Sequence, residues 1–176
     1  MENLFLSLFV LVVVVIAAIT DFRWHRIPNI LTLPSATVGI ISHSLISGWD
    51  GLASSLAGLG LGLCLLLGFY ALGGMAAGDV KLLAAVGAIL GPLNIFLVFL
   101  MTAILGGFYS IGMMIHLLGV KGMLVRVGTM FKTLFLTGKI HLAFDGNAQS
   151  DVRLRYGLVI ALGTLTFQFW NWVGIA

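Results

Sequence analysis

Long apolar runs with almost no charge recur along the chain. Several reach about 17 residues or more, enough to cross a hydrocarbon core of about 30 Å at about 1.5 Å per residue. Charged residues make up 9% of the sequence, against about 25% in soluble domains. The runs lack the alternation of barrel strands, and only helices or closed barrels span lipid. The sequence therefore predicts an all-α integral membrane protein, with a single domain over residues 1–176.

The runs and the turn sequences between them predict about six transmembrane helices. The expected spans are residues 4–20, 30–47, 52–72, 80–90, 93–118 and 156–174. The fourth span is short, or it continues past Pro92 with a kink, because Gly91-Pro92-Leu93-Asn94 resembles a turn. A cleaved signal peptide is the alternative for the first run, but no basic residue precedes it. Glycines four residues apart, Gly58 and Gly62, are expected to pack helices closely.

Basic residues set the predicted orientation. With this layout all nine Lys and Arg residues lie on one side, which is the cytoplasmic side by the positive-inside rule, and only Glu2 and Asp50 carry side-chain charge outside. In residues 119–155, Lys121, Lys132 and Lys139 fall near one helical face. This predicts a cytoplasmic amphipathic segment between the fifth and sixth spans that binds membrane lipids, although a substrate-binding role stays open. No basic stripe with exposed aromatics points to nucleic acid.

Two aspartates are exceptions in this apolar chain. Asp21 ends the first span and Asp79 precedes the fourth, so both lie at the cytoplasmic face. Asp79 also suits the N-cap of its helix, where the helix dipole favours an anion. Asp21 has no such structural role at a helix C-terminus, and its alternative is a solvated ion pair with Arg23 or Arg26. Acids at a membrane edge are often functional.

Together the two acids predict aspartyl chemistry. Two carboxyl groups in one site share a proton, so that one takes a proton from water while the other polarises a carbonyl. The histidines lack metalloprotease spacing, and the single cysteine, Cys64, lies in an apolar run without an evident base. We therefore expect neither a metal nor a cofactor. His43 and His116 lie within spans and are expected to form interhelical hydrogen bonds.

The motifs around the acids resemble the type IV prepilin peptidases. Asp21 followed by Ile27-Pro28-Asn29, then Gly78-Asp79-Val80-Lys81, carries the resemblance. It implies an aspartic endopeptidase of the bacterial inner membrane, related to archaeal preflagellin peptidases, with catalytic Asp21 and Asp79 and an active site toward the cytoplasm. Ala76 stands where the family has a glycine, and Arg155 stands where its last span has a proline.

The same resemblance implies a substrate and further site residues. The chain lacks the insert with paired CxxC motifs of the long members, and it is similar to the short form of tight-adherence (Flp) pilus systems, so N-methylation is not expected. The partner would be a prepilin or pseudopilin precursor. The residues expected to bind substrate or shape the site are Gly78, Ala76, Lys81, Arg23, Arg26, Pro28 and Asn29. Lys81 could equally contact lipid headgroups.

Two other functions fit a chain with acids at one membrane face. A proton-coupled transporter also uses membrane acids, but no acid lies in the middle of a span and inverted repeats are not evident. A non-catalytic scaffold of a pilus or secretion assembly would leave Asp79 as a cap and Asp21 as a solvated charge.

Overall fold

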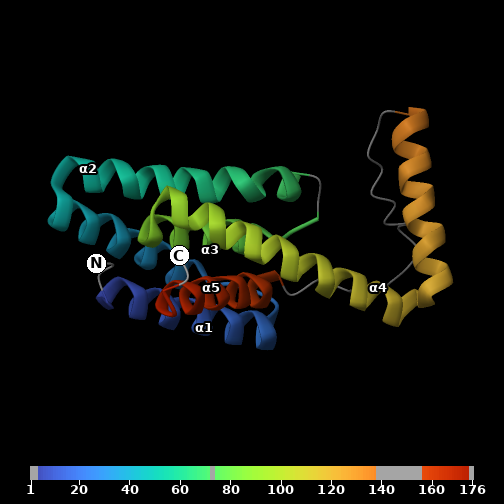
Figure 1. Ribbon diagram of the computed structural model, residues 1–176, viewed down its shortest axis with the longest axis horizontal. Coiled ribbons are helices and arrows are strands. Elements are labelled where there is room, and N and C mark those ends of the chain that lie inside the picture. Colours follow the sequence, from blue (N-terminus) through green and yellow to red (C-terminus); the bar gives the residue numbers. More distant parts are fainter. Residues whose placement is uncertain (1–3, 72–73, 138–155, 175–176) are drawn as a thin grey trace. The chain divides into compact units, whose positions relative to one another are not determined.

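The structure, a computed structural model, describes residues 4–71, 74–137 and 156–174. Within these ranges the chain is helical and contains no strand. The elements are α1 (Leu4–Trp24), α2 (Asn29–Ala71), α3 (Ala77–Leu90), α4 (Pro92–Thr137) and α5 (Tyr156–Trp172) (Figure 1). They form two compact units. The first contains α1, α2, α3, α5 and α4 up to Gly106, and the second contains α4 from Gly107 onward.

α2 is a helical hairpin with two arms, residues 29–47 and 49–71. The arms meet at Gly48, whose φ of 58° and ψ of −132° break the helix. Glycine is suited to this position because a side chain disfavours a positive φ. The turn predicted at residues 48–51 is therefore present but shorter than expected, since Trp49, Asp50 and Gly51 already belong to the second arm.

α3 is a short helix with well-defined ends. It follows Ala76, whose φ of −83° and ψ of 150° are extended, and it ends before Gly91, whose φ is 82°. Pro92 then opens α4, where a missing backbone N–H costs nothing. Of the two predicted alternatives, the short helix is correct. Its 14 residues cover about 21 Å, less than a hydrocarbon core of about 30 Å.

Close backbone approach fixes α3 between the two arms of α2. A Cβ placed on Gly58 would overlap the carbonyl oxygen of Gly87, and one on Gly62 would lie 2.6 Å from that of Leu83. On the first arm, a Cβ on Gly39 would lie 2.8 Å from the carbonyl of Ala88. The predicted packing role of Gly58 and Gly62 is confirmed.

Two side chains of α2 bind the carbonyls at the end of α3. His43 Nε2 lies 2.8 Å from the Ile89 carbonyl oxygen, and Ser55 Oγ donates to the Ala88 carbonyl oxygen at 2.7 Å. The last carbonyls of a helix have no partner within it, so these bonds satisfy groups that would otherwise be buried unpaired. The interhelical bond predicted for His43 is confirmed.

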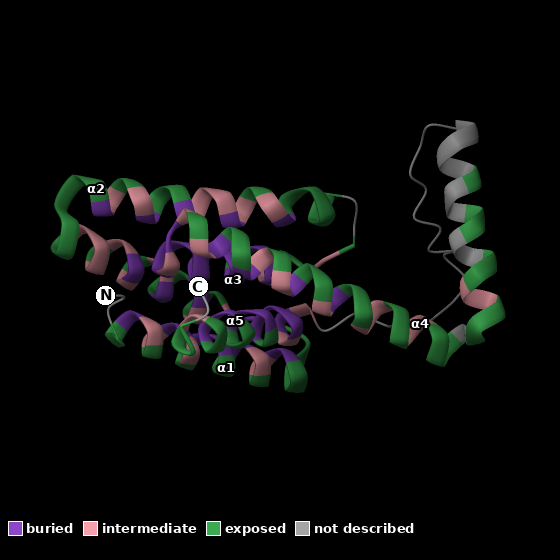
Figure 2. Cartoon of the chain, in the orientation of Figure 1, coloured by how far each residue is buried: buried purple, intermediate pink, exposed green. Residues whose placement is uncertain are grey.

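The core of the first unit surrounds α3, whose residues from Asp79 to Ile89 are buried except Lys81 (Figure 2). Val14 of α1, Leu66 of α2 and Ile160 of α5 join this core, while α1 and α5 lie side by side (Figure 1). Large apolar side chains also stay exposed, Leu45 among them at 81%. Among the described residues, three helices are long and apolar enough to cross a membrane: α1, α2 and residues 92–117 of α4. The count of six spans stays a prediction.

The second unit has a break at Gly119, with a φ of 69° and a ψ of 168°. A separate helical stretch follows, where the sequence predicted an amphipathic segment. Lys121 and Lys132 are exposed, and so are Val120 and Leu124. Lys139 lies outside the described residues, and the predicted lipid contact stays a prediction.

Candidate active site

Asp21 lies in the last turn of α1. The helix ends where His25 adopts a positive φ of 51° and donates its N–H to the Asp21 carbonyl oxygen at 3.0 Å. Pro28, three residues further on, cannot continue the helix. Asp21 itself is only 7% exposed. Its side chain is therefore buried in the protein and is not the solvated charge of the alternative interpretation.

The Asp21 carboxyl group meets the first turn of α5. The backbone N–H of Leu158 donates to Asp21 Oδ2 at 3.3 Å. The C-terminal end of one helix therefore presents its acid to the N-terminal end of another. Early amides of a helix have no partner within it, and the dipole there favours an anion. This contact offsets the unfavourable placement of Asp21 at the end of α1.

Asp79 occupies the first turn of α3. It is 4% exposed, and its Oδ2 accepts the N–H of Ala76 at 3.2 Å. The predicted N-cap role is wrong, because Ala76 is the N-cap and Asp79 is the third residue of the helix. From there its side chain reaches back to the cap N–H, as the acid of a capping box does. Ala76 has no side-chain acceptor to return the bond.

The surroundings of Asp79 favour its neutral form. The pKa of Asp79 is raised from its usual 3.8 to about 7: burial raises it most, the negative charge of Asp21 also raises it, and the Ala76 N–H lowers it. Because desolvation and a like charge disfavour ionisation, their sum outweighs the single amide. Asp79 and Asp21 therefore interact electrostatically in this fold.

Ile27 connects the two acid-bearing regions. A Cβ placed on Gly78, beside Asp79, would lie 3.2 Å from Ile27 Cβ. One placed on Gly157, next to Leu158, would lie 2.9 Å from Ile27 Cδ1 and 2.9 Å from Asp21 Oδ2. The end of α1, the start of α3 and the start of α5 thus meet at one end of the first unit. Asp21 and Asp79 therefore lie at the same end of this unit, as the prediction of a shared membrane face requires, and the cytoplasmic side of that face stays a prediction.

Comparison with known proteins identifies the family of a chain with this arrangement. A family model described as the type IV leader peptidase family matches residues 8–111. The chain belongs to this family. No curated protein and no solved structure matches it. The matched region contains Asp21 and Asp79, and the resemblance to prepilin peptidases is confirmed. Membership indicates a membrane protease that acts on precursor peptides.

Other predicted site residues of this leader peptidase belong to the start of α3, to the start of α2 and to the connection that precedes α2. Lys81 Nζ donates to Asn29 Oδ1 at 3.0 Å, which joins the start of α3 to the start of α2. Pro28 directly precedes α2, and its carbonyl oxygen accepts the N–H of Leu31 at 3.0 Å. Arg26 is exposed in the connection between α1 and α2.

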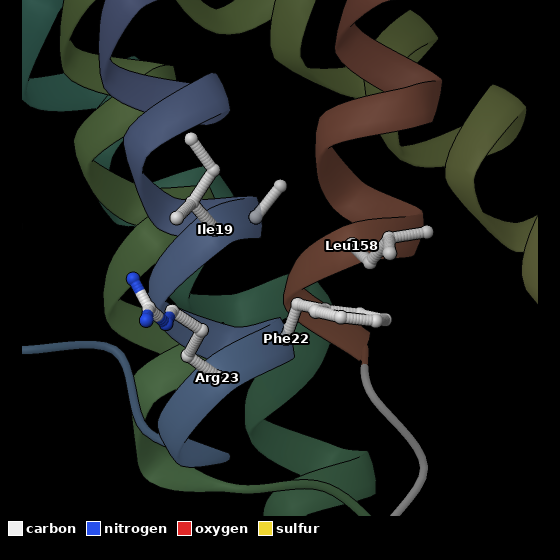
Figure 3. Close-up of a pocket in the computed structure, with 5 residues that line it drawn as sticks. Ile19, Phe22, Arg23 and Leu158 are labelled. Carbon is white, nitrogen blue, oxygen red and sulfur yellow. The ribbon is translucent and has the colours of Figure 1, made fainter.

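An open apolar pocket of about 490 Å³ lies between α1 and α5 of the leader peptidase (Figure 3). It is lined by Ala18, Ile19, Phe22, Arg23 and Leu158. Phe22 extends toward α5, while the guanidinium of Arg23 points away from it (Figure 3). That guanidinium lies 5.7 Å from the centre of the Trp24 ring. A single basic side chain, two residues after Asp21 in the chain, therefore borders this apolar pocket.

Sequence reasoning did not identify Ile27, Gly157 and Leu158 as site residues. The sequence contained two indications: Ile27 belongs to the Ile27-Pro28-Asn29 motif, and Gly157 lies in the Tyr156-Gly157 pair at the predicted cytoplasmic start of the last span. Within the described ranges, no three His, Cys, Asp or Glu side chains gather as a metal-ligand set.

Proposed function

We propose that this leader peptidase is an aspartic endopeptidase in which Asp21 and Asp79 activate water. Two buried carboxyl groups at one end of the fold, each bonded to a helix-terminal amide and electrostatically coupled, carry the proposal. Such a pair holds one proton between them at working pH, because both cannot easily ionise together. This is the protonation state that acid–base hydrolysis needs.

The reaction needs only this pair and water. The ionised carboxyl group removes a proton from water as the water oxygen attacks the peptide carbonyl carbon, and the protonated carboxyl group donates its proton to the carbonyl oxygen. A neutral tetrahedral diol results. The carboxyl group that took the proton from water then protonates the amide nitrogen. The other carboxyl group, now ionised, removes a proton from a diol hydroxyl, and the C–N bond breaks. The products are a carboxylic acid and an amine, and the starting protonation of the pair returns.

The substrate in this proposal is a prepilin or pseudopilin precursor of the Flp type. Cleavage removes its leader at the cytoplasmic face of the inner membrane. Family membership and the apolar, membrane-length helices support a membrane-bound precursor. Arg23 and Arg26 are exposed near Asp21 and supply positive charge for an acidic group of the precursor.

Other residues shape the site in this proposal. Gly78 and Ala76 have little or no side chain, so they add little bulk to the approach to Asp79. Pro28 and the Asn29–Lys81 bond fix the connection between α1 and α2 beside it. N-methylation of the product is not proposed.

Single substitution of each acid tests the proposal. Asp21→Asn and Asp79→Asn keep size and hydrogen bonding but remove the titrating group. We expect each to lower the cleavage of a purified Flp-type pilin precursor in detergent by at least about hundredfold. Asp50→Asn, at an exposed position in the α2 hairpin, serves as the matched control and should cleave normally.

The alternatives give different results in the same experiment. Full cleavage by both Asn variants, with thermal unfolding unchanged, would refute the aspartyl mechanism. A proton-coupled transporter would give ion flux in liposomes that depends on the same acids. A scaffold would give neither cleavage nor flux.

A further inference from the structure

We infer that the first turn of α5 is a third component of the catalytic centre: the Leu158 N–H holds Asp21 as the carboxylate that accepts the proton of water, and Gly157 is the positioning residue that allows this contact. The inference rests on the proposed aspartyl function. It assigns separate roles to the two acids and places Asp79 as the proton donor.

The contact joins complementary charges. Asp21 is buried, and its Oδ2 accepts the Leu158 N–H at 3.3 Å. Leu158 is the third residue of α5, so its N–H has no partner within the helix. A buried carboxylate that accepts such an N–H at the positive end of a helix is stabilised in its ionised form.

Gly157 makes the contact possible through its lack of a side chain. A Cβ at this position would lie 2.9 Å from Asp21 Oδ2 and 3.0 Å from Asp21 Cβ. Ile27 Cδ1 blocks relief in another direction, at 2.9 Å. Any side chain at 157 must therefore displace the carboxyl group or the start of α5.

Asp79 has different surroundings. It also accepts one amide N–H, from Ala76 at 3.2 Å. Burial and the charge of Asp21 outweigh that bond, and the pKa of Asp79 rises to about 7. In our proposal the shared proton resides on Asp79, and Asp21, held by the Leu158 N–H, is the ionised member of the pair. Asp79 can then protonate the substrate carbonyl oxygen, and Asp21 can accept the proton of water.

Few other titratable groups belong to the elements that pack against α1. On α3 they are Asp79 and Lys81, and Lys81 binds Asn29. On α5 the only one is Tyr156, and next to Asp21 in the chain are Arg23, His25 and Arg26. On α2 they are His43, Asp50, Cys64 and Tyr70.

A matched pair of substitutions at Leu158 tests the amide directly. Leu158→Pro removes the N–H but leaves the first turn of α5 intact, because proline is tolerated there. Leu158→Ala shortens the side chain and keeps the N–H. We expect Leu158→Pro to lower kcat about tenfold to hundredfold with KM within about twofold, and to move the acid limb of the pH–rate profile up by about one unit. Leu158→Ala should keep the wild-type limb.

A second variant covers a folding failure of the first. Gly157→Ala should give the same loss of kcat and the same upward shift of the acid limb. Gly60→Ala, where an added Cβ meets nothing within 4 Å, should leave the profile unchanged. If a folded Leu158→Pro or Gly157→Ala variant keeps the wild-type profile while Asp21→Asn is inactive, the inference fails and the aspartyl function stands. If Asp21→Asn and Asp79→Asn are both active, the function itself fails.

Infrared spectroscopy of the carboxyl groups tests the assignment without activity. At about pH 5.5 an ordinary aspartate is ionised, so a carboxylic-acid band in the purified protein should come from Asp79. We expect the band to disappear in Asp79→Asn and to persist in Asp21→Asn. Any other pattern overturns the division of roles.

Discussion

Asp79 is a residue whose burial opposes its own charge. Its pKa of about 7 lies above the usual 3.8, so the folded protein binds a proton that the unfolded chain releases. The contribution of Asp79 to stability is therefore fully present below about pH 4 and is lost as the pH rises through about 7. An enzyme that keeps such a group accepts lower stability above neutral pH.

This predicts a pH dependence of thermal unfolding. Between pH values of about 5 and 8, the Tm of the wild-type protein in detergent should fall by several degrees more than that of Asp79→Asn. Asp50→Asn should follow the wild type. Equal slopes for wild type and Asp79→Asn, by scanning fluorimetry, would contradict the raised pKa.

The sequence was sufficient to identify the acids but not their partners. Asp21 and Asp79 were evident because acids are rare in apolar chains. The Leu158 N–H was not, because a backbone amide belongs to every residue and only tertiary packing decides which one approaches a carboxyl group. The N-cap assignment of Asp79 failed for a local reason: the helix begins two residues earlier, at Ala77.

At the scale of elements, α3 depends on contacts between backbones. Gly58 and Gly87 face each other so closely that a Cβ on either would overlap the carbonyl oxygen of the other. Because backbone atoms cannot yield as a side chain does, α2 and α3 would have to separate. Such separation would also move the start of α3, where Asp79 lies.

We therefore predict that Gly87→Ala destabilises the protein by about 1–3 kcal/mol, the usual cost of overpacking. Gly58→Ala should have a similar effect. Gly60→Ala is the control on the same helix, since the space around Gly60 is open. Urea or heat denaturation in detergent measures the difference, and equal stability of Gly87→Ala and Gly60→Ala would rule out this packing.

Hydropathy predicted one break between helices to the residue and another only approximately. The break between the fifth span and the connection was expected after residue 118, and the structure breaks at Gly119. The hairpin turn at Gly48 proved shorter than its four-residue sequence suggested. Turn residues mark where a helix can break, but neighbouring packing decides how many residues leave the helix.

At the scale of the whole molecule, the first unit has two distinct ends. One end joins Asp21, Asp79 and Leu158, and the opposite end contains the α2 hairpin at Gly48. The basic residues of the sequence predict that the acidic end lies in the cytoplasm. Sidedness could be predicted from charge, whereas the lateral meeting of three helix ends required the packed structure.

Cysteine labelling tests this orientation. In a Cys64→Ser background, Trp49→Cys and His25→Cys place single thiols at exposed positions of the opposite ends. We predict that a membrane-impermeant reagent labels Trp49→Cys in bacterial cells whose outer membrane has been permeabilised. His25→Cys should react only after the inner membrane is opened. Labelling of both from the same side would refute the layout.

Ile27 links the two helix ends that hold the carboxyl groups of Asp21 and Asp79. One branched side chain packs against the start of α3 through Gly78 and against the start of α5 through Gly157. Its volume therefore acts as a spacer between the two helix ends. We therefore expect a displacement of either helix end to move the other as well, so that Asp79 and the Leu158 amide shift together.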